Sequence, residues 1–305
     1  MKSCLDKFTL KNHVIVITGA AGLLGQMHTR GVLDAGGIPV MLDIDGCRLN
    51  NAVDDLMAEY PKANIENFVC SIIDKDRICE ISSYLDCKYG RIDGLINNAC
   101  HNPTMKESVK GDGRFERMTY QEWLDDSEIG IFGSICCSQV FGAYMAEHKG
   151  GVILNIASDL GVIAPNQNLY KVDGLPENDQ PKKPVTYSTV KWGLIGLTKY
   201  LATYWADKNV RSNALAFGGV YNNQGEPFLS RVKEQIPLGR MANRDEYMGS
   251  IVYMLSESHV SKPDGIDAIY SKPALNGMRQ HSEAFLDVGT RQLTFGRVSC
   301  YGGRC

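Results

Sequence analysis

Three side chains in the middle of the sequence could together move a proton to or from an alcohol oxygen. Tyr187 and Lys191 are four residues apart, so both lie on one face of a helix. A nearby ammonium favours the phenolate form of Tyr187, which would lower its pKa and make it a general acid or base near neutral pH. Ser158 would hold the substrate oxygen beside it. Such a set could transfer a proton while a nicotinamide cofactor transfers hydride.

The spacing between the tyrosine and the lysine is not specific by itself. It occurs three times: at Tyr84 and Lys88, at Tyr187 and Lys191, and at Tyr204 and Lys208. On spacing alone each would be a surface or packing pair. Only Tyr187 follows a strand that ends at Ser158 and a long polar loop. We expect Tyr84 to lie on a crossover helix that packs away from the ligand crevice, and Tyr204 to lie too far along its helix.

A glycine-bearing turn near the N-terminus is a candidate phosphate site. Residues 14–25 read V-I-V-I-T-G-A-A-G-L-L-G, and the apolar run before the glycines is typical of a strand buried on both faces. Glycines permit a tight turn and close approach of a pyrophosphate, while the next helix offers free N–H groups and the positive end of its dipole. An ordinary strand-to-helix turn without a ligand is the alternative.

Asp43 ends the second predicted strand, about twenty residues after the glycine turn. A carboxylate at this distance accepts hydrogen bonds from the ribose hydroxyls of NAD and repels the 2′-phosphate of NADP. No Lys or Arg that could attract that phosphate lies within the turn or directly after Asp43, although Arg48 follows five residues later. An isolated aspartate here could equally cap a helix, but its position behind the glycine turn favours NAD as the preferred cofactor.

The remaining apolar patterns alternate between strand and helix. Strands are predicted at 14–17, 38–42, 65–72, 92–96, 152–156 and 210–217, and helices after the glycine turn and at 48–60, 78–89, 120–148, from 187, and within 227–256. This alternation predicts an α/β fold, a single-domain doubly wound parallel sheet over residues 1–256. The pattern then fades, so we expect residues 257–305 to form an irregular C-terminal extension.

Composition excludes several other classes of protein. The chain has 305 residues, of which 44% are hydrophobic and 22% charged, and a formal net charge of −3, unlike the basic excess of nucleic-acid binders. No apolar run approaches a membrane span, and the N-terminal residues lack the apolar core of a signal peptide. The ten cysteines show no metal-type spacing and are interpreted as reduced, mostly buried thiols. We therefore predict a cytoplasmic enzyme without a metal, a nucleic-acid partner or a membrane.

Taken together, these segments resemble the short-chain dehydrogenase/reductase family. The resemblance covers residues 8–256, and its motifs follow the order of the family. They are T-G-A-A-G-L-L-G at 18–25, Asp43, N-N-A at 97–99, N-I-A-S at 155–158, Y-S-T-V-K at 187–191, V-R-S-N-A-L-A-F-G-G-V at 210–220 and P-L-G-R-M at 237–241. Each motif is weak alone, but the joint match is highly specific.

The resemblance implies a Rossmann-type domain, oxidoreduction of alcohols and ketones with NAD(P), and a homodimer or homotetramer. It assigns Tyr187 as the acid or base, Lys191 to the nicotinamide ribose and to tuning Tyr187, and Ser158 to orienting a small-molecule substrate. The residues implied to bind the cofactor are Gly19, Gly22, Leu24, Gly25, Asp43, Ser71, Ile72, Asn97, Ala99, Tyr187, Lys191, Gly219 and Val220.

Several departures from the family pattern keep alternatives open. The glycine spacing matches sugar-nucleotide epimerases and dehydratases that retain their NAD, which is a second hypothesis. Gly130 stands where the family has a relay asparagine, and no closing strand with a D-G-G turn follows Glu257, so a dinucleotide-binding protein with weak catalysis is a third. The leading hypothesis is a reductase or dehydrogenase of a polar alcohol or ketone, a sugar derivative. The long loop after Ser158 resembles reductases of flagellin-modification and surface-sugar pathways and suits a hydroxylated or phosphorylated substrate. A surface insertion without a role in substrate binding is the alternative for this loop.

Overall fold

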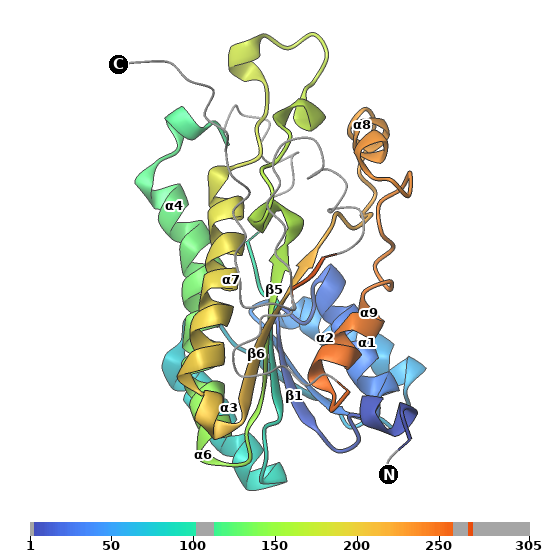
Figure 1. Ribbon diagram of the computed structural model, residues 1–305, viewed down its shortest axis with the longest axis vertical. Helices are drawn as coiled ribbons and strands as arrows, with labels where there is room; N and C mark the ends of the chain where they lie inside the picture. The colour runs from blue at the N-terminus through green and yellow to red at the C-terminus, as the bar shows by residue number, and fades with distance from the viewer. Residues whose placement is uncertain (1–2, 102–112, 259–267, 271–305) are drawn as a thin grey trace, which may run out of the picture.

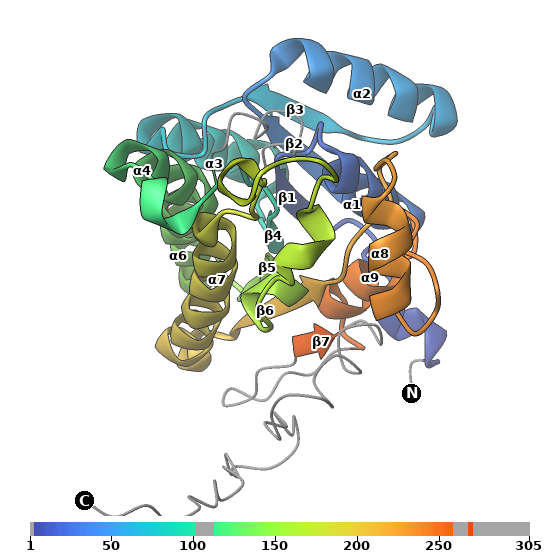
Figure 2. The ribbon, with the colours of Figure 1, turned by 90° about the horizontal axis from the view of Figure 1, so that it is seen from above.

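A computed structural model describes residues 3–101, 113–258 and 268–270 of the chain. These residues form one parallel β-sheet with helices on both faces (Figures 1 and 2). The strands are β1 (Val14–Thr18), β2 (Ile38–Asp43), β3 (Glu66–Val69), β4 (Gly94–Asn97), β5 (Gly151–Ser158), β6 (Val210–Phe217) and β7 (Ala268–Tyr270). The predicted doubly wound α/β fold is confirmed.

The strand order β3-β2-β1-β4-β5-β6-β7 places a reversal of winding between β1 and β4. Both neighbours pair with β1 in parallel, with Ile17 opposite Met41 of β2 and opposite Ile96 of β4. The connections leave this point in opposite directions, so the loops at the carboxyl ends of β1 and β4 diverge. A crevice at that edge is where doubly wound sheets bind their ligands.

Alternating side chains of the strands build two hydrophobic cores, one on each face of the sheet. In β1, Ile15 and Ile17 pack in one core, while Val14 and Val16 pack in the other. The first core is covered by α1 (Leu23–Asp34), α2 (Gly46–Glu59) and α9 (Met248–Leu255). The second is covered by α3 (Lys75–Tyr89), the long helix Tyr120–Glu147 and α7 (Val185–Tyr204).

The long helix predicted at 120–148 contains two π-helical segments. Its parts are α4 (Tyr120–Ser127), a π segment (Glu128–Phe132), α5 (Gly133–Cys137), a second π segment (Ser138–Gly142) and α6 (Ala143–Glu147). Among the described residues this helix is long and apolar enough to cross a membrane by length and composition. Half of its most apolar window is buried in the fold, as expected for a core helix.

Other elements lie mainly at the carboxyl edge of the sheet. They are α8 (Phe228–Gln235) and the 3₁₀ turns Leu5–Phe8, Phe115–Arg117, Asp159–Gly161, Gln167–Tyr170, Glu177–Asp179 and Ala206–Lys208. The strand β7 pairs in parallel with β6, although the sequence shows no recognisable closing strand. Apart from residues 257–258 and 268–270, the predicted C-terminal extension lies outside the described residues.

A buried chain of hydrogen bonds ties α7 to the sheet. The Asn97 amide of β4 donates to Asn155 Oδ1 of β5 over 2.8 Å, and the Asn155 amide donates to Thr198 Oγ1 of α7 over 2.9 Å. Asn97 also donates to Ser138 Oγ over 3.1 Å. These four side chains are all buried. Because each bond needs a matched donor and acceptor, the chain links the long helix, two strands and α7 in one arrangement.

The cysteines are less buried than the sequence suggests. Eight lie in the described residues and all are free, and only Cys70, Cys136 and Cys137 are buried. Cys4, Cys47, Cys79 and Cys87 are exposed, and Cys100 is half-buried. The prediction of mostly buried thiols is therefore wrong for the described part of the chain. Small thiols are tolerated on the solvent side of α2 and α3, where Cys47 and Cys79 lie.

His28 of α1 should make the free energy of unfolding depend on pH. It is fully buried beside Phe217, and burial lowers its pKa to about 3, with the Asn98 amide offsetting only part of that shift. Below about pH 6.5 the histidine binds a proton in the unfolded chain, whereas in the folded chain it stays neutral until the pH falls to about 3. The free energy of unfolding should therefore fall by on the order of 1.4 kcal/mol per pH unit between pH 6.5 and 3 through this residue.

Urea denaturation at pH 7.5 and pH 5 measures this contribution. His28→Leu should flatten the fall in unfolding free energy relative to the parent chain. His148→Gln, at an exposed position, is the matched control and should follow the parent. An equal fall in His28→Leu and the parent would contradict the prediction.

Candidate active site

A cavity of about 620 Å³ opens at the carboxyl ends of the central strands, at the reversal of winding. Its walls come from the turns that follow strands β1 to β6 and from the start of α7. Twelve of the residues predicted from the sequence line it: Gly19, Gly22, Leu24, Asp43, Ser71, Ile72, Ala99, Ser158, Tyr187, Lys191, Gly219 and Val220. The fold therefore brings most of the predicted site residues together at this cavity.

The glycine turn has the shape that a dinucleotide phosphate requires. Gly19 has φ +61°, and a Cβ there would come within 2.9 Å of Ala99 Cα. Helix α1 starts directly behind the turn with Gly22 as its N-cap, and its first turn carries no acidic side chain. Its free N–H groups and dipole therefore favour an anion at the cavity wall. The residues present fit an NAD(P) cofactor.

Two residues predicted to bind the cofactor do not line the cavity. Gly25 packs behind the turn, where a Cβ would come within 2.2 Å of Gly19 O. Asn97 is buried between the strands, and Asn98 lines the cavity instead. Asn98 Nδ2 donates to the carbonyl oxygens of Thr18 and Gly19, which holds the β4 end against the glycine turn. Asn97 is the last residue of β4, one residue beyond the predicted end of that strand, and its amide is bonded to Asn155 of β5.

The Asp43 carboxylate lies on the cavity wall at the end of β2. Its Oδ2 accepts from the Ala21 N–H over 2.9 Å, and its Oδ1 accepts from the Asp45 N–H over 3.1 Å. Each carboxylate oxygen keeps a lone pair for a further donor. The N-cap of α2 is Asp45, which accepts from the Arg48 N–H, so the capping alternative does not describe Asp43.

The three candidate catalytic residues meet at the opposite end of the cavity. Ser158 is the last residue of β5, Tyr187 lies in the first turn of α7, and Lys191 follows one turn later. The Lys191 ammonium lies 5.8 Å from the centre of the Tyr187 ring and donates to Ile156 O over 2.7 Å. The Ser158 hydroxyl donates to Asp159 Oδ1 over 2.8 Å.

The phenol of Tyr187 does not have the lowered pKa that the sequence predicts. Burial raises its pKa above the ordinary value, and this effect outweighs the lowering by Lys191 and by the Ser158 hydrogen bond. The sequence could show the lysine but not the depth at which the ring is buried. Tyr187 is therefore protonated at neutral pH, which is the form that can donate to a substrate oxygen.

Gly130 lies in the first π segment, where the long helix presses against α7. A Cβ at this position would come within 2.3 Å of Val190 Cγ1, so an asparagine would require Val190 to move. Val190 is one residue before Lys191 on the same helix. The close contact between the two helices therefore leaves no room for an asparagine side chain at position 130 unless Val190 moves.

Several residues of the cavity were missed by the sequence interpretation. The loop after Ser158 contributes Asp159, Tyr170 and Lys183 to the wall. Asp159 could have been found from its position next to Ser158 at a strand end. Tyr170 and Lys183 carry no periodic signal because their loop has no repeating structure. Other lining residues not predicted are Leu23, Ile44, Arg48, Cys70, Asn98, Cys100, Ile129, Ile156, Ala157, Leu160, Phe217, Gly218, Asn222, Gln224 and Met241. The guanidinium-bearing side chain of Arg48 therefore shares the cavity with Asp43.

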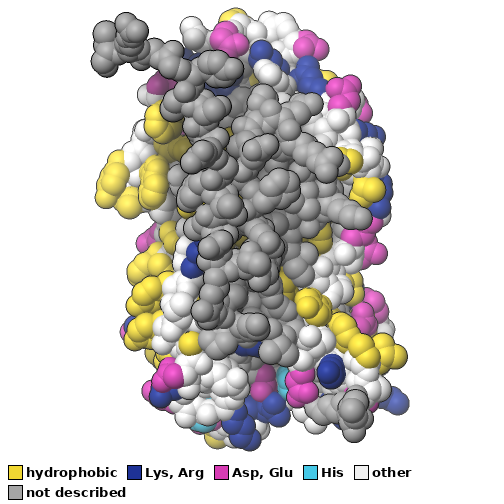
Figure 3. Space-filling model, in the orientation of Figure 1, with side chains coloured by type: hydrophobic (Ala, Val, Ile, Leu, Met, Phe, Trp, Pro, Cys, Tyr) yellow, Lys and Arg dark blue, Asp and Glu magenta, His cyan; other side chains and the backbone are white. Residues whose placement is uncertain are grey.

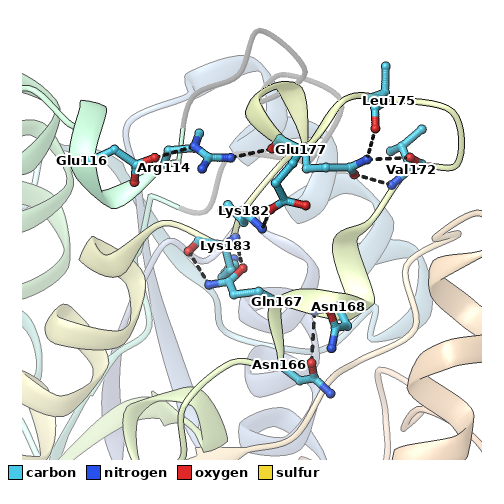
Figure 4. Close-up of polar contacts among 11 residues, drawn as sticks. Arg114, Glu116, Asn166, Gln167, Asn168, Val172, Leu175, Glu177, Lys182 and Lys183 are labelled. Atoms are coloured by element: carbon cyan, nitrogen blue, oxygen red, sulfur yellow. Dashed lines mark hydrogen bonds and ion pairs between the residues drawn. The ribbon is translucent and has the colours of Figure 1, made fainter.

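This loop is ordered by two glutamine side chains (Figure 4). Gln167 accepts from the Lys183 N–H over 2.8 Å and donates to Lys183 O over 3.2 Å. Gln180 is buried, exchanges two hydrogen bonds with the Val172 backbone, and donates to Leu175 O. Each side-chain amide both donates to and accepts from the backbone of one residue, which is how a neighbouring β-strand would bond to it. The loop therefore presents Lys183 at a defined position.

Comparison with known proteins assigns the family. The family model described as short chain dehydrogenase matches residues 13–171, and the model described as enoyl-(acyl carrier protein) reductase matches residues 178–261. Together they span nearly all the described residues.

Curated relatives match over most of their length. Flagellin modification protein A of Campylobacter coli is 28% identical, covering 81% of this chain and 93% of that protein. The NADH-dependent L-xylulose reductase of Ambrosiozyma monospora is 28% identical, covering 87% and 96%. The D-threitol dehydrogenase of Mycolicibacterium smegmatis is 25% identical, covering 82% and 88%.

Solved structures share the fold. A gluconate 5-dehydrogenase from Burkholderia cenocepacia, in complex with NADP and tartrate, superposes with a TM-score of 0.73 at 19% identity, covering 90% of this chain and 99% of that one. A short-chain dehydrogenase from Leptospira borgpetersenii with bound NAD+ gives 0.71 at 24% identity, covering 90% and 96%. The chain belongs to the short-chain dehydrogenase/reductase family and is an NAD(P)-dependent oxidoreductase of alcohols and ketones.

Proposed function

We propose that the protein is an NAD-preferring oxidoreductase that interconverts a polar alcohol and its ketone in a sugar derivative. One observation carries the proposal: Ser158, Tyr187 and Lys191 share a cavity with Asp43 and the glycine turn. The relatives named for xylulose and threitol support a polyhydroxylated substrate. The polar loop that supplies Asp159 and Lys183 to the wall suits such a substrate.

Each candidate catalytic residue has a distinct role in this proposal. In reduction the Tyr187 phenol donates its proton to the carbonyl oxygen, and in oxidation the Tyr187 phenolate accepts a proton from the alcohol. Ser158 leaves Asp159 and donates to the same substrate oxygen, which orients it. Lys191 stabilises the phenolate that remains after proton transfer. A bound nicotinamide would supply or accept the hydride.

The two other hypotheses are less well supported. A retained-NAD epimerase or dehydratase rests only on the glycine spacing, whereas the relatives are named as reductases and dehydrogenases. A binding protein with weak catalysis rests on Gly130 and on the missing closing strand, but β7 pairs with β6 and the relatives are named as reductases and dehydrogenases.

A substrate screen that follows NADH absorbance tests the proposed function, with NADP(H) run alongside. We expect turnover with polyols or ketoses at a rate that depends on added cofactor. Purified protein that carries tightly bound NAD and consumes none would favour the epimerase hypothesis instead. Cofactor binding without turnover across the panel would favour the binding protein.

The preference for NAD is a proposal that rests on the Asp43 carboxylate. Asp43→Asn keeps an oxygen for the Ala21 N–H and removes the charge, so kcat/KM for NADP relative to NAD should rise at least about tenfold. Asp45→Asn is the matched control, because asparagine caps a helix as well as aspartate does. Equal use of both cofactors by the parent chain would overturn the preference.

We also propose a homo-oligomer that pairs through the outer face of the long helix and α7. Large apolar side chains are exposed there, and they gather along the edge where α4 and α7 lie (Figure 3). They include Trp123, Phe132, Trp192, Tyr200 and Tyr204. Apolar surface of this kind marks an interface in soluble proteins.

A charge in this face should separate the subunits. Trp192→Glu would place a carboxylate at a position that is 59% exposed in the single chain, so folding should be little affected. Light scattering after size exclusion should show a dimer or tetramer for the parent and a monomer for the variant. A monomeric parent chain would contradict the proposal.

We propose the cytoplasm as the compartment. The exposed thiols of Cys4, Cys47, Cys79 and Cys87 are all free. Free surface thiols fit a reducing environment, where glutathione and thioredoxin keep them reduced.

A further inference from the structure

A second lysine lies at the reacting end of the cavity. The Lys183 ammonium is 4.0 Å from the centre of the Tyr187 ring, closer than the ammonium of Lys191 at 5.8 Å. Lys183 lines the same cavity as Ser158 and Asp159. Two cations therefore flank the ring of the candidate acid, one from α7 and one from the long loop.

The position of Lys183 is built by the loop. Its backbone N–H and C=O are both bonded to the Gln167 side chain, which fixes the direction of the chain at this residue (Figure 4). The preceding residue, Lys182, does not line the cavity and pairs with Glu177 over 3.1 Å on the outside of the loop. The two neighbouring lysines thus have different surroundings: Lys183 lines the cavity, and Lys182 pairs with a carboxylate outside it.

Lys183 is a cation in a poorly hydrated wall. Burial lowers its pKa to about 8, against raising effects from Cys100 and Asp126, while Lys191 lowers it further. The Asp126 carboxylate is already bonded to the Thr186 hydroxyl and lies 2.5 Å from His101 Nδ1. An anion that enters the cavity would stabilise the charged form of Lys183 further, and the partly desolvated ammonium would bind it more strongly than a hydrated one.

The carboxylate of Asp159 does not neutralise this end of the cavity. It accepts from the Ser158 hydroxyl and from the Leu160 N–H, each over 2.8 Å. Burial raises its pKa, so its negative charge is disfavoured where it lies. Among the described residues that line the cavity, the wall beside Tyr187 therefore carries two lysines and one carboxylate whose charge is disfavoured, and this balance favours a negative group there.

We propose that Lys183 binds an oxyanion of the substrate, a carboxylate or a phosphate carried close to the carbon that reacts at Tyr187. The substrate class is then an acidic sugar derivative rather than a neutral polyol. This inference rests on the proposed function, since it takes Tyr187 as the residue that faces the reacting oxygen. Because the Lys183 ammonium lies over the Tyr187 ring, an anion bound to it would lie beside the reacting oxygen of the substrate. The acidic group must therefore be close, along the carbon chain, to the carbon that reacts.

The test compares acidic and neutral substrates that share one carbon skeleton. Aldonic acids and polyol phosphates are each paired with the corresponding polyol, and kcat/KM is measured for the parent, Lys183→Met, Lys183→Arg and Lys182→Met. The parent should prefer an acid over its polyol. Lys183→Met should lower that acid-to-polyol ratio about tenfold to a hundredfold, and Lys183→Arg should restore part of it. Lys182→Met should keep the parental ratio.

The outcomes separate the inference from the proposed function. Preference for aldonic acids identifies a carboxylate, and preference for polyol phosphates identifies a phosphate. A parent that turns over polyols better than either acid, or a Lys183→Met that loses acids and polyols equally, overturns the inference and leaves the oxidoreductase assignment intact. The second result would make Lys183 a positioning residue for Tyr187.

Calorimetric titration with the same aldonic acids and phosphates gives a readout that needs no turnover. Binding to the parent that Lys183→Met weakens at least tenfold, in a chain without turnover, would support the anion site while the proposed function fails. No binding to the parent would overturn the anion site. Thermal melting of Lys183→Met within a few degrees of the parent checks that the variant is folded.

Discussion

Tyr187→Phe should lower kcat by about a hundredfold to ten-thousandfold and leave NADH binding nearly unchanged. The variant keeps the ring that packs in the cavity wall and removes only the hydroxyl that carries the proton. The phenol is protonated at neutral pH because burial raises its pKa, so reduction should suffer at least as much as oxidation. Stopped-flow single turnover with NADH, beside fluorescence titration of the cofactor, separates the two quantities.

Tyr84→Phe is the matched control, because Tyr84 has the same spacing to its lysine. Its hydroxyl donates to Glu66 over 3.1 Å and accepts from Lys88 over 3.0 Å. None of these three residues lines the cavity. Its loss should cost about 0.5–1.5 kcal/mol of stability and leave kcat unchanged. Unchanged turnover in Tyr187→Phe would remove Tyr187 from the mechanism.

Gly25→Ala should disrupt the glycine turn from behind. The new Cβ would come within 2.2 Å of Gly19 O and 2.7 Å of Ala20 Cα, and both are backbone atoms that no rotamer change can move. Overpacking of this kind costs about 1–3 kcal/mol, and the displaced turn should also weaken NADH binding. Thermal unfolding with and without NADH measures both effects.

Gly196→Ala provides the opposite case on a helix. Gly196 lies in α7 with no atom within 4 Å of its would-be Cβ. Alanine there should stabilise the protein by about 0.5–1 kcal/mol through its better helix propensity. A destabilised Gly196→Ala, or a Gly25→Ala that melts with the parent, would contradict this interpretation of the two sites.

The sheet could be predicted from the sequence because its strands are buried on both faces and read as apolar runs. The sixth strand was predicted with its observed bounds, Val210–Phe217, whereas β3 is shorter than predicted. The three-residue strand β7 escaped prediction because so short a segment carries no pattern. The family resemblance assigned Asn97 to the cofactor, but Asn97 is buried in β4 and the next residue, Asn98, lines the cavity instead.

The site was predictable where motifs carry the chemistry and unpredictable where tertiary contacts do. Ser158, Tyr187 and Lys191 stand at recognisable spacings, and the structure brings them to one cavity. The raised pKa of Tyr187 depends on burial, which no spacing reveals. Lys183 reaches the cavity through a loop held by Gln167 and Gln180, and its position follows from those hydrogen bonds rather than from any periodicity.

The hydrogen-bond chain from Asn97 through Asn155 to Thr198 fixes the position and rotation of α7, and with them the placement of the active-site side chains on that helix. Thr198 lies eleven residues after Tyr187 and seven after Lys191, close to three and two whole helical turns, so the three side chains share one face of α7. Sliding α7 by one residue would move it about 1.5 Å, rotate that face by about 100° and leave a buried amide without its partner. Other positions of the helix are thereby destabilised. The orientation of the proton donor Tyr187 depends on the Asn155–Thr198 hydrogen bond about three helical turns away.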